Sequence, residues 1–351
     1  MLSYEVIEWG TALEARRRET PRPIGTEVLV KLKYCGVCHS DVHIRDGYFD
    51  LGGGKRLPME DRGMYPPLTL GHEPFGTVIA AGPDAIGVPL GEERLVYPWT
   101  GCGGCARCAT GDDNFCASAR MIGLQRPGGY ADHLIVPHPR YLMDCTGIDA
   151  RWAATLACSG LSAYSAVLKL MPVAPDEWIA VIGAGGLGLS AIGCLRALGH
   201  ERIVAIDIDA QKLAAAARSG AAETLDARAS DAFSSLRKIT GGAFCGAVDF
   251  VGSAETANLV LPACRKGGKL ILVGLFGGEI NLSIAGTILR AITVQGSHLG
   301  SVNQLNEVVA LARAGKIAPI PIETRPLCEV NRTLDELKAG KVLGRIVAEI
   351  N

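Results

Sequence analysis

Residues 178–188 read Trp-Ile-Ala-Val-Ile-Gly-Ala-Gly-Gly-Leu-Gly, an apolar run that passes directly into a glycine-rich turn. Residues 178–182 predict a buried strand, residues 189–198 continue at helical spacing, and residues 203–207 predict a second strand that ends in Asp207. In such a strand–turn–helix unit the glycines let the backbone approach a pyrophosphate, which binds at the helix N-terminus. The stretch therefore predicts a βαβ unit that binds a dinucleotide.

The predicted secondary structure differs before and after this unit. After it, further strands predicted at 247–251, 269–273 and 291–294 alternate with helical patterns, which is typical of a parallel, doubly wound α/β sheet. Before residue 100, short β-patterned runs are broken by Gly and Pro, which predicts an all-β unit of barrel or sandwich type. The end of the chain predicts helices at 304–314 and 330–339 and a closing strand at 344–350.

Composition excludes several classes of protein. The 351 residues carry 35 basic and 36 acidic side chains, so there is no electrostatic argument for a nucleic-acid or membrane partner. The N-terminal residues lack the pattern of a signal peptide, and no apolar run approaches the ~18 residues that span a bilayer. Twelve cysteines, several closely spaced, favour metal thiolates in a reducing compartment over disulfides. We therefore expect a cytoplasmic protein.

Four of the cysteines have the spacing Cys102-x2-Cys105-x2-Cys108-x7-Cys116. Four thiolates within one short segment can close a tetrahedron around zinc, and they leave no open coordination position. Four free thiols, or an iron–sulfur cluster with an unusual spacing, are the alternatives. The segment predicts a structural zinc site.

A second group of possible ligands is spread along the chain. Residues 36–43 read Gly-Val-Cys-His-Ser-Asp-Val-His, and in isolation they fit a polar turn after a strand. His72 and Cys158 lie downstream, in Gly-His-Glu and Ala-Cys-Ser-Gly contexts. With Cys38 they complete the Cys-His-Cys set of a catalytic zinc that keeps one position open.

These motifs, in this order and over almost the whole chain, resemble the zinc-containing medium-chain alcohol dehydrogenases. The resemblance implies a GroES-like β-barrel catalytic domain at 1–158, with the structural-zinc lobe at about 100–117. It also implies a Rossmann NAD-binding domain at 159–296 and a return of residues 297–351 to the catalytic domain. The active site would lie in the cleft between the two domains.

The resemblance also implies a mechanism. Cys38, His72 and Cys158 would hold the catalytic zinc, which lowers the pKa of an alcohol before its hydride passes to NAD. Ser40 would begin a proton relay through the cofactor ribose to His43, for which a surface-loop histidine is the alternative.

Two acids next to the predicted ligands have subsidiary roles. Asp41 is expected to orient the imidazole of His72 by accepting a hydrogen bond from it. Glu73 is expected either to approach the metal as an alternate ligand or to form a structural ion pair.

The predicted cofactor contacts come from many segments. Asp207 should bind the adenosine ribose hydroxyls and repel a 2′-phosphate, which favours NAD over NADP. His39 and Arg345 match positions that reach the pyrophosphate, although a solvated surface charge is the alternative for Arg345. The other predicted contacts are Ser162, Gly183, Gly185, Gly186, Leu187, Gly188, Ile208, Lys212, Val251, Val273, Gly274, Leu275, Ser297 and His298.

Substrate choice depends on the segment 46–67, which we interpret as a long Gly- and Pro-rich loop inserted at the mouth of the cleft. Its Tyr48 and Phe49 are predicted to line the pocket together with Ser40 and Trp99, although Trp99 also fits a core position. The predicted reaction is the reversible oxidation of a primary or secondary alcohol to an aldehyde or ketone.

Three alternatives remain beside this prediction. A polyol or amino-alcohol dehydrogenase of the same superfamily is disfavoured by the thiol at Cys158, where polyol relatives usually carry glutamate. A zinc-free quinone-reductase relative would lack both cysteine sets. A non-catalytic NAD- or zinc-binding protein would not need the relay residues. By analogy we expect a homo-oligomer, with a tetramer favoured over a dimer.

Overall fold

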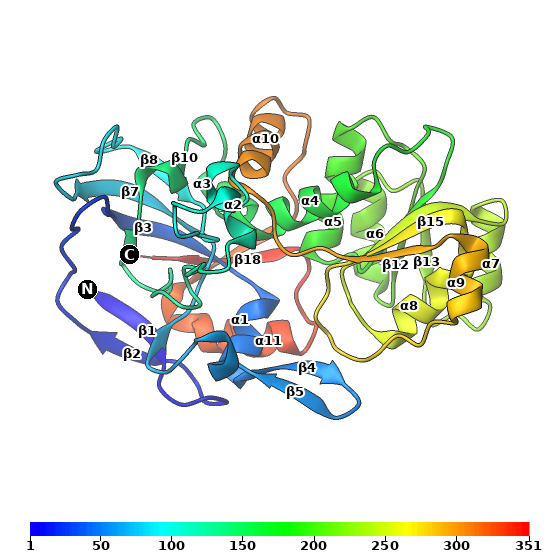
Figure 1. The fold of residues 1–351 in the computed structure, drawn as a ribbon, viewed down its shortest axis with the longest axis horizontal. Coiled ribbons are helices and arrows are strands. Elements are labelled where there is room, and N and C mark those ends of the chain that lie inside the picture. Colours follow the sequence, from blue (N-terminus) through cyan, green and yellow to red (C-terminus); the bar gives the residue numbers. More distant parts are fainter. Residues whose placement is uncertain (351) are drawn as a thin grey trace.

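The computed structural model describes residues 1–350, and the chain folds into two halves with a long helical run between them (Figure 1). Both termini lie in the same half, together with the N-terminal strands, while the middle of the chain forms the other half. The predicted combination of an all-β unit with a doubly wound α/β unit is confirmed.

A mainly antiparallel sheet forms the first half. Its strand order is β10–β8–β7–β3–β18–β17, and β9 also pairs with β3. The bounds are β3 Val28–Val37, β7 Pro74–Ala81, β8 Glu93–Val96, β9 His133–Val136, β10 Leu142–Met143, β17 Ile322–Pro326 and β18 Arg345–Glu349. A smaller sheet pairs β2 Glu14–Arg17, β1 Leu2–Val6 and β6 Leu68–Thr69 in that order. The last strand, β18, runs antiparallel to β3, so the C-terminal segment is built into the sheet of the N-terminal segment.

Six parallel strands form the sheet of the second half, in the order β13–β12–β11–β14–β15–β16. The strand bounds are β11 Ile179–Ile182, β12 Ile203–Asp207, β13 Glu223–Asp226, β14 Phe244–Asp249, β15 Cys264–Leu272 and β16 Thr293–Gly296. The helices of this half are α5 Gly186–Ala197, α6 Ala210–Arg218, α7 Ala232–Ile239, α8 Ala254–Val260 and α9 Ile284–Arg290. The strand order reverses between β11 and β14, and such a reversal opens a ligand crevice at the carboxyl ends of the strands.

Strand β13 was not predicted from the sequence. Only Leu225 of its four residues is buried, so the strand carries almost no apolar signal. Its pairing with β12 alone defines it.

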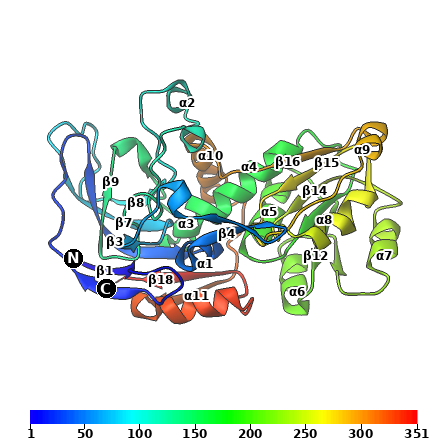
Figure 2. The same ribbon diagram turned by 60° about the horizontal axis from the view of Figure 1, so that its bottom comes forward.

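Helices outside the parallel sheet connect and cover the two halves. They are α1 His39–Asp46, α2 Ala106–Ala109, α3 Ala150–Thr155, α4 Leu161–Leu170, α10 Val302–Arg313 and α11 Val330–Lys338. A wide helical turn, Leu156–Gly160, joins α3 to α4. The resulting run is long and apolar enough to cross a membrane by length and composition, but 89% of its most apolar window is buried inside the protein. It is therefore a core helix, and Figure 2 shows it between the two sheets.

The prediction of a loop at 46–67 was wrong. The segment forms an antiparallel hairpin, β4 Tyr48–Gly52 and β5 Lys55–Pro58, followed by a short helical turn, Glu60–Arg62. The glycines at the tip supply the required left-handed backbone, with φ of +57° at Gly53 and +74° at Gly54. The hairpin reaches the other half of the molecule, where the Lys55 ammonium lies 3.9 Å from the Glu279 carboxylate (Figure 1).

Candidate active site

Three segments bring the predicted zinc ligands together at the cleft. Cys38 lies between β3 and α1, His72 lies between β6 and β7, and Cys158 lies in the wide turn before α4. The two Sγ atoms are 3.8 Å apart. Ligand atoms of these three residues and of Glu73 all lie within 4.8 Å of one another, and all four residues are buried.

The imidazole of His72 is oriented by a buried carboxylate. Its Nδ1 lies 3.0 Å from Asp41 Oδ1, and Asp41 also accepts hydrogen bonds from the Tyr130 hydroxyl and the Cys38 amide. Burial opposes protonation of His72, but the charge and hydrogen bond of Asp41 raise the pKa of His72 well above its usual value. The remaining ring atom, Nε2, therefore faces the cysteines in a fixed orientation.

The imidazole and the two thiols of this cluster are chemically suited to bind a zinc ion. His72 Nε2 is buried and has no hydrogen-bond partner within residues 1–350, which would be costly unless a ligand binds it. The contact with Cys158 holds the pKa of Cys38 well below that of a free thiol, so a thiolate is already favoured at this position. Two thiolates and one imidazole are a typical catalytic set, which leaves one position for substrate.

Behind this cluster, Glu73 forms a buried ion pair with Arg345. Burial raises the pKa of Glu73 to about 7, although the charge of Arg345 acts in the opposite direction. Within the described residues, Glu73 Oε2 has no hydrogen-bond partner. Arg345 also lines the neighbouring cavity, so this residue takes part in both the ion pair and the cavity wall.

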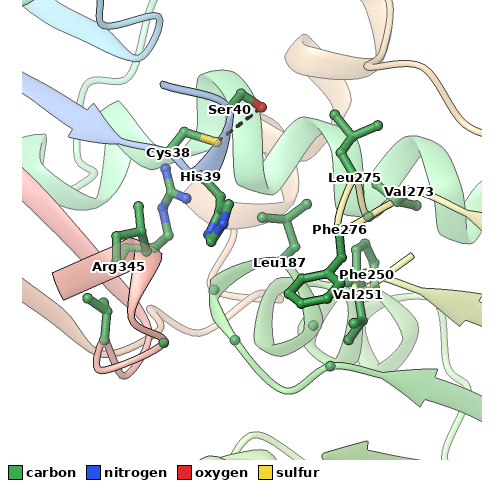
Figure 3. A pocket seen from close by; sticks show the side chains of 18 of the residues that line it. Cys38, His39, Ser40, Leu187, Phe250, Val251, Val273, Leu275, Phe276 and Arg345 are labelled. Atoms are coloured by element: carbon green, nitrogen blue, oxygen red, sulfur yellow. Dashed lines mark hydrogen bonds between the residues drawn. The ribbon is translucent and has the colours of Figure 1, made fainter. Parts of the chain in front are cut away.

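A cavity of about 330 Å³ lies at the carboxyl ends of β11 and β14 (Figure 3). Gly183, with φ of +85°, begins the turn, and a methyl group added at Gly185 would meet no atom within 4 Å. This open space above the first turn of α5 fits a pyrophosphate. The predicted cofactor residues in the lining are His39, Gly183, Gly185, Gly186, Leu187, Gly188, Asp207, Lys212, Val251, Val273, Gly274, Leu275 and Arg345.

Some predicted cofactor residues lie elsewhere. Ile208 is 56% exposed and does not line this cavity. Ser162, Ser297 and His298 line a second cavity instead. Asp207 is in place, and its carboxylate accepts hydrogen bonds from the amides of Ala184 at 2.7 Å and Ile208 at 2.7 Å.

The second cavity, of about 300 Å³, begins at the Cys38–His72–Cys158 cluster. Of the predicted pocket residues it contains Ser40, Phe49 and Trp99, but Tyr48 lies outside it and stacks under the Arg56 guanidinium at 4.0 Å. Sequence reasoning missed most of the wall, which is formed by Ile44, Leu51, Leu57, Arg62, Met121, Leu124 and Leu299. These residues come from separate segments without a shared motif. The two cavities have Cys38, Ser40, Leu187, Val273 and Leu275 in common.

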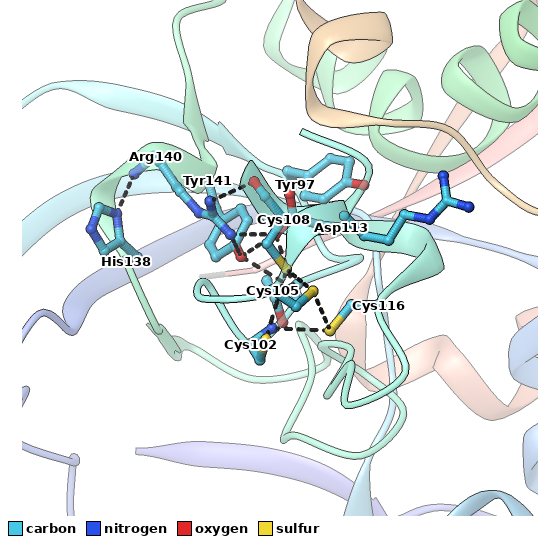
Figure 4. Close-up of polar contacts among 12 residues, drawn as sticks. Tyr97, Cys102, Cys105, Cys108, Asp113, Cys116, His138, Arg140 and Tyr141 are labelled. Atoms are coloured by element: carbon cyan, nitrogen blue, oxygen red, sulfur yellow. Dashed lines mark hydrogen bonds and ion pairs between the residues drawn. The ribbon is translucent and has the colours of Figure 1, made fainter. Parts of the chain in front are cut away.

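The four-cysteine lobe forms a separate cluster (Figure 4). Cys105 Sγ lies 3.6 Å from Cys108 Sγ and 3.8 Å from Cys116 Sγ, and all four ligand atoms lie within 4.8 Å. Such a closed set of thiolates fits a structural zinc. Buried Asp113 anchors the lobe by accepting a hydrogen bond from the Tyr141 hydroxyl at 2.6 Å.

Comparisons with known proteins agree with this arrangement. Residues 25–145 match the family described as alcohol dehydrogenase GroES-like domain, and residues 186–314 match the family described as zinc-binding dehydrogenase. Two proteins called NAD-dependent alcohol dehydrogenase, from Sulfurisphaera tokodaii and Saccharolobus solfataricus, are each 36% identical over 99% of this chain and 99% of their own. The crystal structure of an alcohol dehydrogenase from Aeropyrum pernix superposes with a TM-score of 0.89 at 30% identity, covering all of both chains.

Proposed function

This chain belongs to the zinc-containing medium-chain alcohol dehydrogenases, and we propose that it catalyses the reversible, NAD-dependent oxidation of an alcohol to an aldehyde or ketone. One observation carries the proposal. The cavity with the dinucleotide glycines and the largely apolar cavity share Cys38 and Ser40, so cofactor and substrate would meet at the zinc ligands.

The metal-binding role falls to Cys38, His72 Nε2 and Cys158. A zinc ion held there supplies a Lewis acid that favours the deprotonated form of an alcohol. Asp41 fixes the imidazole through Nδ1, so that Nε2 stays directed at the cysteines. Glu73 is proposed as an alternate ligand, since a carboxylate oxygen of this buried residue lies within 4.8 Å of the ligand atoms of Cys38, His72 and Cys158.

The proton released from the substrate is proposed to leave through Ser40 and His43. Ser40 lines both cavities, and His43 lines the cofactor cavity, with its ring centroid 5.3 Å from that of His39. Burial lowers the pKa of His43, and the charge of His39 acts in the same direction. His43 is therefore neutral at pH 7 and can accept a proton.

We propose that Asp207 binds the adenosine ribose and selects NAD over NADP. Lys212 and His39 line the same cavity, and burial lowers the pKa of His39, so this contact with the pyrophosphate would be uncharged at neutral pH. Ser162, Ser297 and His298 are proposed to contact the nicotinamide end from the substrate side.

The test combines metal content with turnover. We expect two zinc ions per chain and NAD reduction with members of a panel of primary, secondary and benzylic alcohols. Cys38→Ala should lose one zinc ion and all turnover while the fold persists. A parent protein that holds only one zinc ion, retained in Cys38→Ala and lost in Cys102→Ala, would contradict the catalytic assignment.

We also propose a homo-oligomer, with a tetramer favoured over a dimer. Strand β16 forms one edge of the parallel sheet, and α9 beside it presents Ile284, Ile288 and Leu289, which are 71–80% exposed (Figure 2). A second copy of this chain would cover this apolar face. Light scattering should give a multiple of 36.9 kDa that decreases in Ile288→Lys; an unchanged mass would exclude this face. We further propose that the NAD-binding domain extends from residue 159 to residue 296, between two parts of the catalytic domain, and that the protein is cytoplasmic.

A further inference from the structure

The substrate cavity carries one permanent cation in a wall that is otherwise mostly apolar. Besides the cluster at its inner end, the cavity is lined by aromatic and aliphatic side chains such as Phe49, Leu57 and Leu124. Arg62, at the end of the short turn Glu60–Arg62, is the only Lys or Arg among the lining residues. A simple alkyl alcohol gives no reason for a guanidinium at this place.

The main chain holds Arg62 firmly at the cavity. Its amide donates to the Met59 carbonyl at 3.0 Å, and its carbonyl accepts a hydrogen bond from Gln125 Nε2 at 3.1 Å. Met59 and Met64 on either side are fully buried, which fixes the turn in the core. The side chain is thus presented by a rigid segment of the fold.

The charge of Arg62 has no anionic partner in the described part of the chain. Among residues 1–350 no carboxylate lies within ion-pair distance of its guanidinium, and no side-chain hydrogen bond from it is found. The guanidinium instead lies 5.2 Å from the ring centroid of Phe49. Burial lowers the pKa of Arg62, and the pKa of nearby His298 is lowered by burial and by the charge of Arg62. A partly desolvated cation without a partner is unfavourable unless a ligand supplies the counter-charge.

Asp50 is the one acid among the lining residues of this cavity, and its carboxylate binds a backbone amide of the hairpin. Its Oδ1 accepts the Gly52 amide at 2.7 Å, and the residue is exposed on the hairpin beside Gly277. It stabilises the hairpin tip and leaves Arg62 unpaired.

We propose that the substrates of this enzyme are hydroxy acids, in which an apolar chain separates the alcohol from a carboxylate that Arg62 binds. A planar guanidinium recognises a carboxylate with two parallel hydrogen bonds, and the apolar wall accommodates the methylene groups between the two ends. The inference rests on the proposed dehydrogenase function and names its substrate class.

The experiment compares matched substrates on the zinc-loaded enzyme with NAD. ω-Hydroxy acids of increasing length are assayed beside the 1-alkanols and the ω-amino alcohols of the same length. We expect kcat/KM for the best hydroxy acid to exceed that of its alkanol by about 10- to 100-fold, the range of a hydrogen-bonded charge pair. Arg62→Met should remove this preference, measured as the ratio of the two kcat/KM values, and Arg62→Lys should restore part of it.

Arg56→Met is the matched control, because it removes the same charge from the hairpin that precedes the Arg62 turn, at a side chain that stacks on Tyr48 outside the cavity. It should keep the preference for hydroxy acids. Equal kcat/KM for acid and alkanol at every length, a preference for amino alcohols, or a preference that survives Arg62→Met would overturn the proposal. Failure of the dehydrogenase function itself is distinguishable, since neither acids nor alkanols would then be oxidised.

Discussion

Two glycine-to-alanine substitutions in the turn after β11 should separate an effect on stability from an effect on cofactor binding. A methyl group built at Gly188 lies 2.9 Å from the Gly183 carbonyl carbon, closer still to its oxygen, and 3.5 Å from Val181 Cγ1. One built at Gly185 meets nothing within 4 Å, and the φ of −76° at Gly185 suits alanine. Gly188→Ala should therefore strain the fold, while Gly185→Ala should only fill the space over the turn.

The magnitudes follow from this geometry. In Gly188→Ala the helix α5 must move away from β11, and overpacking of this kind costs about 1–3 kcal/mol. With a urea slope of about 2 kcal/mol/M, a loss of about 2 kcal/mol lowers the unfolding midpoint by about 1 M. Gly185→Ala should leave the midpoint unchanged, but its methyl group occupies the pyrophosphate position, and we expect the Kd for NAD to rise by about tenfold or more.

Urea unfolding followed by circular dichroism, and NAD titration by calorimetry, provide the two readouts. The reasoning would be refuted by a Gly188→Ala protein with the unfolding midpoint of the parent. It would also be refuted by a Gly185→Ala protein that is destabilised to the same extent while it binds NAD normally.

Three further predictions concern the site. Arg345→Met should lower the free energy of unfolding by about 3–5 kcal/mol, because it leaves Glu73 buried without its partner, and Glu73→Gln added to it should recover part of the loss in the same urea experiment. His43→Gln should lower kcat by about 10²-fold. In the parent enzyme the fall of kcat/KM at acidic pH should have its midpoint below pH 6.5, because the lowered pKa keeps His43 neutral down to lower pH. A midpoint above pH 6.5 would contradict the role of His43 as proton acceptor. A chelator that removes one of the two zinc ions should abolish turnover and leave the four-cysteine cluster occupied. Cys38→Ser should abolish turnover without any chelator. Elemental analysis measures the zinc content, and NAD reduction measures the turnover.

Local patterns were sufficient for much of the fold and for the metal ligands. The apolar run that ends at Ile182, directly before the glycine-rich turn, predicted the strand found there, and the close spacing from Cys102 to Cys116 gathers its ligands within one loop. The sequence therefore determined the parallel sheet, the glycine turn and the structural-zinc lobe. The residue types of Cys38, His72 and Cys158 suggested the catalytic zinc set, and the resemblance to the family supported it.

Tertiary structure decided the rest, because it depends on which distant segments meet. The hairpin at Tyr48–Gly52 and Lys55–Pro58 looked like a loop, since its turn glycines outweigh a weak strand pattern. In the sequence, Arg62 is one of several charged residues in a polar segment. Only its contacts with Phe49 and Gln125 in the folded chain place it at the cavity. Long-range packing, which no local pattern encodes, determines the wall of a substrate pocket and the partner of a buried charge.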